Sequence, residues 1–228
     1  MSQHRQPLIA IIAVSVIARI GVAIALGDQL RGLPGAADQL SYQTLAVSLI
    51  DGRGFAFESG WWPLTAAGAP TAHWSYLYTG FLAAVQAIAG INPVLVRIIQ
   101  SIAVGVLQPL LAYLLGRSMF GEGAGLAAAA LTAIYAYFVY YSATLMTEPF
   151  YFTAILASLY MAIRLANRIK SEGGSPANGL RRAVVLGLVL AVAVLLRQVF
   201  LLFVPILLLW IWLAGGRKKA AIAALPAL

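Results

Sequence analysis

Long apolar segments separated by short polar stretches make up most of the chain. Residues 7–27 form an apolar segment as long as the ~20 residues that a helix needs to cross a bilayer. The later apolar segments are 76–90, 94–116, 124–142, 149–166 and 183–214, and another starts near residue 220. The pattern predicts an all-α fold, a polytopic transmembrane helical bundle of about six to seven spans. A cleaved signal peptide is the alternative for 7–27, but Arg19 interrupts this long segment, which favours a retained first span.

Two of these segments have unusual lengths for a single span. As a helix, 76–90 covers roughly 22 Å of a hydrocarbon core about 30 Å thick. The segment 183–214 is too long for one span, and Arg197 lies near its middle. We therefore expect 76–90 to stay on one side of the membrane and 183–214 to form a hairpin of two short helices that turns near Arg197.

The polar stretch 28–74 interrupts the apolar pattern after the first span. Within it, 39–51 is predicted to be an amphipathic helix, since apolar residues recur at i, i+3, i+4 and i+7. These residues are Tyr42, Leu45, Ala46 and Leu49. Residues 52–74 are rich in Gly and Pro and hold three Trp, which is typical of an irregular loop at a membrane interface.

Composition supports a membrane protein. Of the 228 residues, 62% are hydrophobic and only 10% charged, which excludes a disordered chain and is unusual for a soluble domain. The chain has no Cys, so disulfides and thiolate metal sites are excluded. The net charge of +8 is too sparse for a phosphate-binding surface and is better explained by membrane topology, so no nucleic-acid partner is expected.

The distribution of basic residues selects one topology. With 76–90 outside and 183–214 as a hairpin, one face carries Arg5, Arg117, Arg164, Arg168, Lys170, Arg181, Arg182, Arg217, Lys218 and Lys219. By the positive-inside rule this face is cytoplasmic, with the N-terminus. The outer loops are then 28–92 and 142–149, and 167–182 is a cytoplasmic loop. Asp38 and Glu148 consequently share the outer face.

Asp38 and Glu148 each have two interpretations. Asp38 directly precedes the predicted helix 39–51, where Asp is a favoured N-cap, but a carboxylate at the membrane surface could also act as a general base. Glu148 lies before Pro149, so it or Thr147 could cap the next span. An ionisable group at membrane depth is also a functional candidate.

The basic candidates are less specific. Arg197 could snorkel to the interface or bind a lipid phosphate, and Arg19 and Arg97 have the same two interpretations. Arg53 could reach an anionic head group or be a solvated loop charge.

His73 is one of two histidines in the chain. A histidine in a loop is usually polar surface, but with Asp38 and Glu148 it could complete a divalent-metal site. No nucleotide-binding, zinc-protease or nucleophile-elbow motif is present.

Several motifs in order resemble the N-terminal half of the GT-C superfamily of membrane glycosyltransferases, in the group of protein O-mannosyltransferases, aminoarabinose transferases and RgtA/B/C/D-like bacterial proteins. They are Asp38 after the first span; Tyr42, Ala46 and Leu49; Gly52, Gly54 and Phe55; PTA at 70–72; YLY at 76–78; the segment 97–121; TEP at 147–149; and LLR at 195–197. Many relatives carry Pro-Pro before the aromatic Tyr, where this chain has Trp74 and Ser75.

The resemblance implies an inverting transfer of a sugar from a polyprenyl-phosphate donor to a protein, lipid or glycan acceptor on the outer face. It implies that Asp38 is the catalytic base, that Glu148 supports the site or a divalent metal, and that Arg197 binds the donor phosphate. Arg53 is the second candidate for binding this phosphate. Substrate contacts are expected from Tyr42, His73 and Tyr76.

Members of this group are longer than the present sequence. The chain is therefore expected to be the N-terminal part of one GT-C-like domain, with the possibility of a partner membrane subunit. Composition is compatible with a bacterial inner membrane. The alternative is a non-catalytic membrane protein, either a transporter or flippase or a subunit of a glycan-assembly complex.

Overall fold

The computed structural model describes residues 5–63, 65–170 and 176–215, and within these ranges the secondary structure is helical apart from isolated β-bridges. The helices are α1 (Arg5–Leu26), α2 (Gln39–Ile50), α3 (Tyr76–Ala89), α4 (Pro93–Phe120), α5 (Glu122–Ile134), α6 (Ala136–Ser142), α7 (Glu148–Lys170), α8 (Pro176–Leu196), the 3₁₀ helix η1 (Gln198–Leu202) and α9 (Val204–Gly215). The predicted all-α class is confirmed. Helices α7 and α8 extend from both sides into the predicted loop 167–182.

In the described part of the chain, four helices are long and apolar enough to cross a membrane: α1, α4, α7 and most of α8. The pair α5 and α6, bent by 55°, forms a fifth candidate span. This is fewer than the six to seven spans expected, because the second arm of the predicted hairpin, Gln198–Ala214, is shorter. The apolar segment expected near residue 220 lies outside the described residues.

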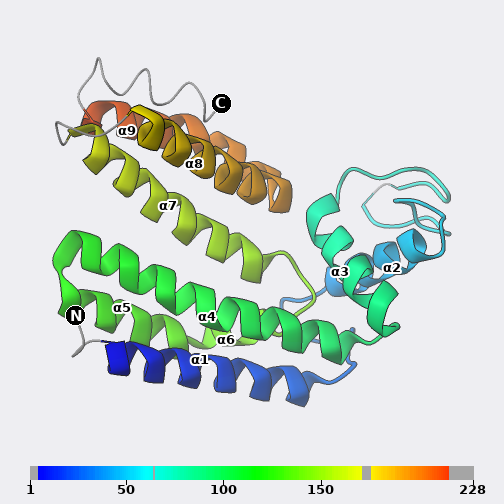
Figure 1. Ribbon diagram of the computed structural model, residues 1–228. Helices are drawn as coiled ribbons and strands as arrows, with labels where there is room; N and C mark the ends of the chain where they lie inside the picture. Colours follow the sequence, from blue (N-terminus) through cyan, green and yellow to red (C-terminus); the bar gives the residue numbers. More distant parts are fainter. Residues whose placement is uncertain (1–4, 64, 171–175, 216–228) are drawn as a thin grey trace.

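Helix α4 lies at the centre of the bundle, against α1, α5 and α7, while α8 and α9 pack on the other side of α7 (Figure 1). Glycines permit the closest of these approaches. A Cβ on Gly105 of α4 would lie 3.1 Å from the Val16 Cα of α1, and one on Gly116 would lie 3.1 Å from the Gly125 Cα of α5. Small residues at such crossings let helix backbones pack tightly inside a membrane.

Arg19 stabilises the bend between α5 and α6. Its side chain is fully buried, and its guanidinium donates to the carbonyl oxygens of Thr132 and Ala133, each at 3.1 Å, and to Gln108 Oε1 at 3.1 Å. The helix breaks at Tyr135, so carbonyls at the end of α5 lose their intrahelical partners and need other donors. Arg19 therefore neither snorkels nor faces a phosphate.

The predicted hairpin in 183–214 is confirmed. Helix α8 ends at Leu196, Arg197 is extended with φ −146° and ψ 111°, and η1 leads into α9, which returns beside α7 (Figure 1). A polar residue between two apolar helices thus marks the break, as the sequence predicted.

Helices α2 and α3 and the 51–75 segment lie at the end of the bundle where α1 and α8 finish and α4 and α7 begin (Figure 1). Tyr42, Leu45 and Ala46 of α2 are buried as predicted, but so are its polar residues Gln39 and Gln43. Helix α2 is therefore enclosed on more than its apolar face. The arrangement brings the segments before α2 and α7 and the break after α8 to one end of the bundle; which side of the membrane this end faces stays a prediction.

Candidate functional site

A cavity of about 590 Å³ lies where these three segments meet. Its lining residues come from the start of α2, the 73–76 segment, the loop before α7 and the hairpin turn; they are Asp38, Tyr42, His73, Trp74, Ser75, Tyr76, Thr147, Val194, Leu195, Leu196, Arg197, Gln198 and Val199. Most of the residues singled out in the sequence therefore lie around one space. We call it the Asp38 cavity.

Arg197 pairs with Glu148 beside the Asp38 cavity. Its Nη2 donates to the Glu148 carboxylate, and its Nε donates to Thr147 Oγ1 at 3.1 Å. The Glu148 side chain is 10% exposed and that of Arg197 39% exposed. Within the described ranges, Arg197 Nη1 has no hydrogen-bond acceptor, so this nitrogen remains available to an anionic ligand in the cavity.

Asp38 lines the same cavity without a partner. Asp38 occupies the N-cap position of α2, as the sequence predicted, but its backbone is helical and its side chain makes no capping hydrogen bond. The carboxylate forms no ion pair or hydrogen bond with any described side chain or backbone group. An unpaired, half-buried carboxylate in a cavity can accept a proton from a bound hydroxyl group.

Tyr42 and Trp74 form the inner wall of the cavity. Tyr42 is 6% exposed and meets the rings of Trp74 and Tyr78 edge-on, at centroid distances of 5.4 and 5.0 Å. Burial raises the pKa of Tyr42 to about 12. Its hydroxyl therefore stays protonated at neutral pH and can donate a hydrogen bond.

His73 and Tyr76 lie at the exposed rim. The His73 ring packs edge-on against Trp74 at 5.0 Å, and Tyr76 donates from its hydroxyl to the Thr71 carbonyl oxygen at 2.9 Å. Both positions suit contact with a substrate that enters the cavity.

The metal site expected from Asp38, His73 and Glu148 is not formed. No three described His, Asp or Glu side chains gather closely enough to hold a metal ion. The physical reason lies in their partners, since Glu148 is paired with the Arg197 cation and His73 packs on the rim.

Arg53 lies apart from the Asp38 cavity. It forms ion pairs with Asp51 at 2.8 Å and with Glu58 at 3.3 Å, and it lines a separate cavity against α2. The structure therefore does not bring Arg53 together with Arg197.

A buried polar cluster connects the loops that carry Asp38 and Glu148. Its centre is Arg97, which neither snorkels nor faces a phosphate, as the sequence analysis had considered, but binds protein oxygens. Arg97 of α4 is fully buried and donates to the carbonyl oxygens of Gln29, at 2.6 Å, and Ala143, and to Gln39 Oε1 at 3.2 Å. The same Gln39 oxygen accepts from the Leu145 backbone N–H at 3.2 Å. Gln39 directly follows Asp38, so Arg97 joins the segment before α2 to the segment before α7.

Gln100, one turn further along α4, holds the second of these segments. Its Nε2 donates to the Ser142 and Thr144 carbonyl oxygens, each at 2.8 Å, and its Oε1 accepts from the Tyr78 hydroxyl at 2.8 Å. One feature of the sequence indicated such a cluster: Arg and Gln lie inside the apolar segment 94–116. Polar groups at membrane depth need hydrogen-bond partners within the protein.

The chain is similar to a known protein family and to a solved structure. The family model for dolichyl-phosphate-mannose-protein mannosyltransferases matches residues 73–226, more than half of the chain. Among solved structures, the chain is similar to the archaeal oligosaccharyltransferase AglB from Archaeoglobus fulgidus, in complex with an inhibitory peptide and a dolichol-phosphate. The TM-score is 0.73 at 16% identity, over 96% of this chain and 28% of that one. No curated protein matches the sequence. The likeness to AglB shows a shared fold, and the chain spans about a quarter of that protein's length.

Proposed function

Because the chain belongs to the family of dolichyl-phosphate-mannose-protein mannosyltransferases, we propose that it is a glycosyltransferase using a sugar linked to a polyprenyl phosphate. The acceptor is a hydroxyl-bearing protein, lipid or glycan on the outer face of the membrane. The observation that carries this proposal is that the unpaired Asp38 carboxylate and the Arg197 guanidinium line one cavity. The dolichol-phosphate bound to the AglB relative supports the same class of donor.

Asp38 serves as the general base. It takes the proton of the acceptor hydroxyl as the acceptor oxygen attacks the anomeric carbon of the donor sugar. A new carbon–oxygen bond forms while the bond from the anomeric carbon to the phosphate oxygen breaks. The bonding electron pair leaves with the polyprenyl phosphate, and one displacement inverts the anomeric configuration.

Arg197 stabilises the negative charge that grows on the leaving phosphate, as a guanidinium can donate two hydrogen bonds to phosphate oxygens. Glu148 holds Arg197 in place through their ion pair. The protonated Tyr42 hydroxyl and the rim residues His73 and Tyr76 contact the sugar or the acceptor. Arg53 lies outside this arrangement.

The test is sugar transfer by the purified chain in lipid, using a panel of polyprenyl-phosphate sugars with Asp38→Asn and Asp51→Asn as a matched pair. Both substitutions remove one carboxylate charge, but Asp51 pairs with Arg53 outside the Asp38 cavity. Loss of a general base is expected to reduce transfer by about 10²–10⁴-fold in Asp38→Asn, with Asp51→Asn close to wild type.

Equal rates for Asp38→Asn and wild type would remove Asp38 from the base role. Donor binding without turnover in the wild type would instead favour a non-catalytic subunit of a larger assembly.

A further inference from the structure

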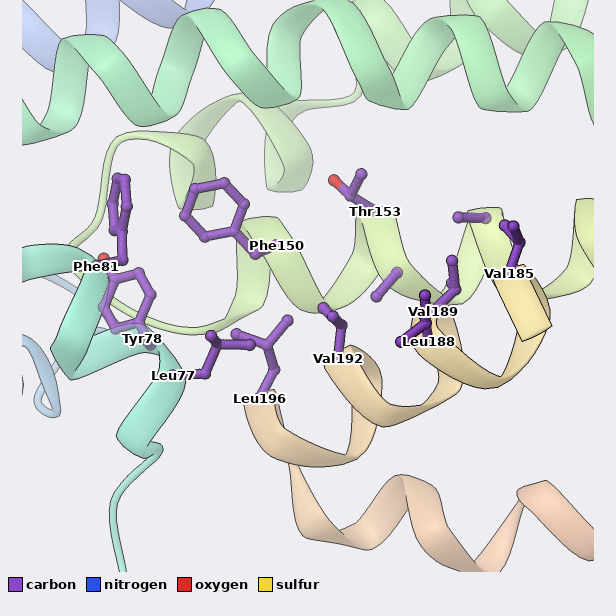
Figure 2. Close-up of a pocket in the computed structure, with 12 residues that line it drawn as sticks. Leu77, Tyr78, Phe81, Phe150, Thr153, Val185, Leu188, Val189, Val192 and Leu196 are labelled. Atoms are coloured by element: carbon purple, nitrogen blue, oxygen red, sulfur yellow. The ribbon is translucent and has the colours of Figure 1, made fainter. Parts of the chain in front are cut away.

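An apolar cavity of about 510 Å³ lies between α3, α7 and α8, separate from the Asp38 cavity (Figure 2). Its lining is hydrocarbon except for the hydroxyl groups of Tyr78 and Thr153. Both hydroxyls are already engaged, since Tyr78 donates to Gln100 Oε1 and Thr153 donates to the Pro149 carbonyl oxygen, each at 2.8 Å. The cavity thus offers no free polar group and suits a hydrocarbon chain.

A basic cavity adjoins this apolar one, since the two share a lining residue. Val185 of α8 lines both the apolar cavity and a further cavity of about 400 Å³ whose other lining residues are Tyr160, Met161, Arg164, Arg181 and Arg182. At the other end of the apolar cavity, Leu196 also lines the Asp38 cavity. Val185 and Leu196 are about 17 Å apart along α8, at about 1.5 Å per residue.

The arginines of the basic cavity come from two helices, α7 and α8. Arg164 of α7 donates to the Tyr160 hydroxyl at 2.8 Å, and Arg182 of α8 reaches the Arg164 carbonyl oxygen at 3.5 Å. Arg181 is exposed. Across residues 5–63, 65–170 and 176–215, none of the three forms an ion pair with a carboxylate, whereas Arg53, Arg117 and Arg197 each do.

We propose that the groove between α7 and α8 binds an anionic glycerophospholipid. Its phosphate lies among Arg164, Arg181 and Arg182, and one acyl chain fills the apolar cavity towards Leu196. One guanidinium group can bind two phosphate oxygens at once, and basic pockets between membrane helices suit anionic lipid head groups.

The adjoining apolar cavity selects a lipid over a soluble phosphate. The charge distribution places the head group at the end with three arginines, because the opposite end offers the single Arg197, which is paired with Glu148 and which we assign to the donor phosphate.

Lipid retention by the purified full chain tests this directly. The detergent-solubilised protein is titrated with dioleoyl phosphatidylglycerol or dioleoyl phosphatidylcholine, and bound lipid is counted by native mass spectrometry. We expect the wild type to retain phosphatidylglycerol preferentially. At about fivefold per arginine, the double variant Arg181→Gln/Arg182→Gln loses roughly 25-fold in this preference.

Two further variants distinguish an effect of the arginine charge from an effect on folding. Arg5→Gln removes a basic residue outside the cavity, at the start of α1, which begins at the end of the bundle where α7 finishes (Figure 1), and this variant retains the preference. Arg181→Lys keeps the charge and most of the preference. Thermal unfolding of each variant checks that the fold is intact.

The binding of the acyl chain in the apolar cavity is tested separately. Val189→Trp fills the apolar cavity and lowers retention of the dioleoyl lipid while all three arginines remain (Figure 2). Inorganic phosphate does not displace the lipid; if it did, the basic cavity would be a simple anion site. Equal retention of the two lipids by the wild type would overturn the proposal. Displacement by polyprenyl phosphate, with no effect of the arginine substitutions, would assign the groove to the donor chain instead.

Discussion

Arg197 and Glu148, which are far apart in the sequence, form an ion pair between the hairpin turn after α8 and the first turn of α7. The pair leaves Asp38 as the carboxylate without a cation partner among the described residues that line this cavity. Asp38 and Glu148 therefore differ in chemistry: Glu148 is bound to a guanidinium, and Asp38 is available to a substrate.

Glu148→Ala is expected to raise the KM for the polyprenyl-phosphate donor about tenfold, because Arg197 loses the charged hydrogen bond that orients it. The effect on kcat is smaller than that of Asp38→Asn. Steady-state transfer kinetics measure both constants. Glu58→Ala, which removes an exposed carboxylate paired with Arg53, is the control. A fall in kcat as deep as that of Asp38→Asn, at unchanged KM, would instead give Glu148 a direct part in the chemistry.

The variants Arg197→Gln and Arg53→Gln distinguish between the two arginines that the sequence analysis assigned to the donor phosphate. Arg197→Gln should raise the donor KM about tenfold, since a charged hydrogen bond to phosphate is lost. Arg53→Gln should leave KM within about twofold, because surface ion pairs contribute little and Arg53 lines another cavity. Donor titrations of both variants decide the matter, and equal effects would return Arg53 to the donor site.

Arg97→Leu is expected to lower the unfolding temperature of the detergent-solubilised chain. The substitution leaves the Gln29 and Ala143 carbonyl oxygens without their donor, and each unsatisfied buried group costs about 1–3 kcal/mol. Arg31→Leu, at an exposed position, is the control. Circular dichroism during heating provides the measurement, and equal unfolding temperatures for both variants would contradict a stabilising role for the cluster.

Gly125→Ala and Gly123→Ala test the contact between α4 and α5. A Cβ at residue 125 would lie 2.8 Å from the Tyr113 carbonyl oxygen, whereas one at residue 123 meets nothing within 4 Å. Gly125→Ala should therefore destabilise the protein by about 1–3 kcal/mol. Gly123→Ala should be neutral or slightly stabilising, because Ala favours the helix. Thermal unfolding compares the stabilities of the two variants. Equal stabilities would show that α4 and α5 can move apart at residue 125 without destabilising the protein.

The helices and their breaks could be predicted from the sequence, because each depends on local hydrophobicity and length. The segment 94–116 is apolar enough to be a helix wherever it packs, and a charge inside 183–214 is sufficient reason for a turn at Arg197. The basic residues along the chain also predicted that Asp38 and Glu148 share one end of the bundle, and in the structure Asp38 lines a cavity with Arg197, which pairs with Glu148.

Only the tertiary structure decided which polar groups meet. The Asp38 side chain does not cap α2, Arg53 pairs with its own loop, and Arg19 bonds to carbonyl oxygens of a helix more than a hundred residues away. Local pattern cannot predict such choices, because a buried polar group takes whichever partner the packing of distant segments brings within hydrogen-bonding distance. The sequence by itself determined the helices and their common end; the packing of α4, α7 and α8 determined that Asp38 remains free while Glu148 binds Arg197.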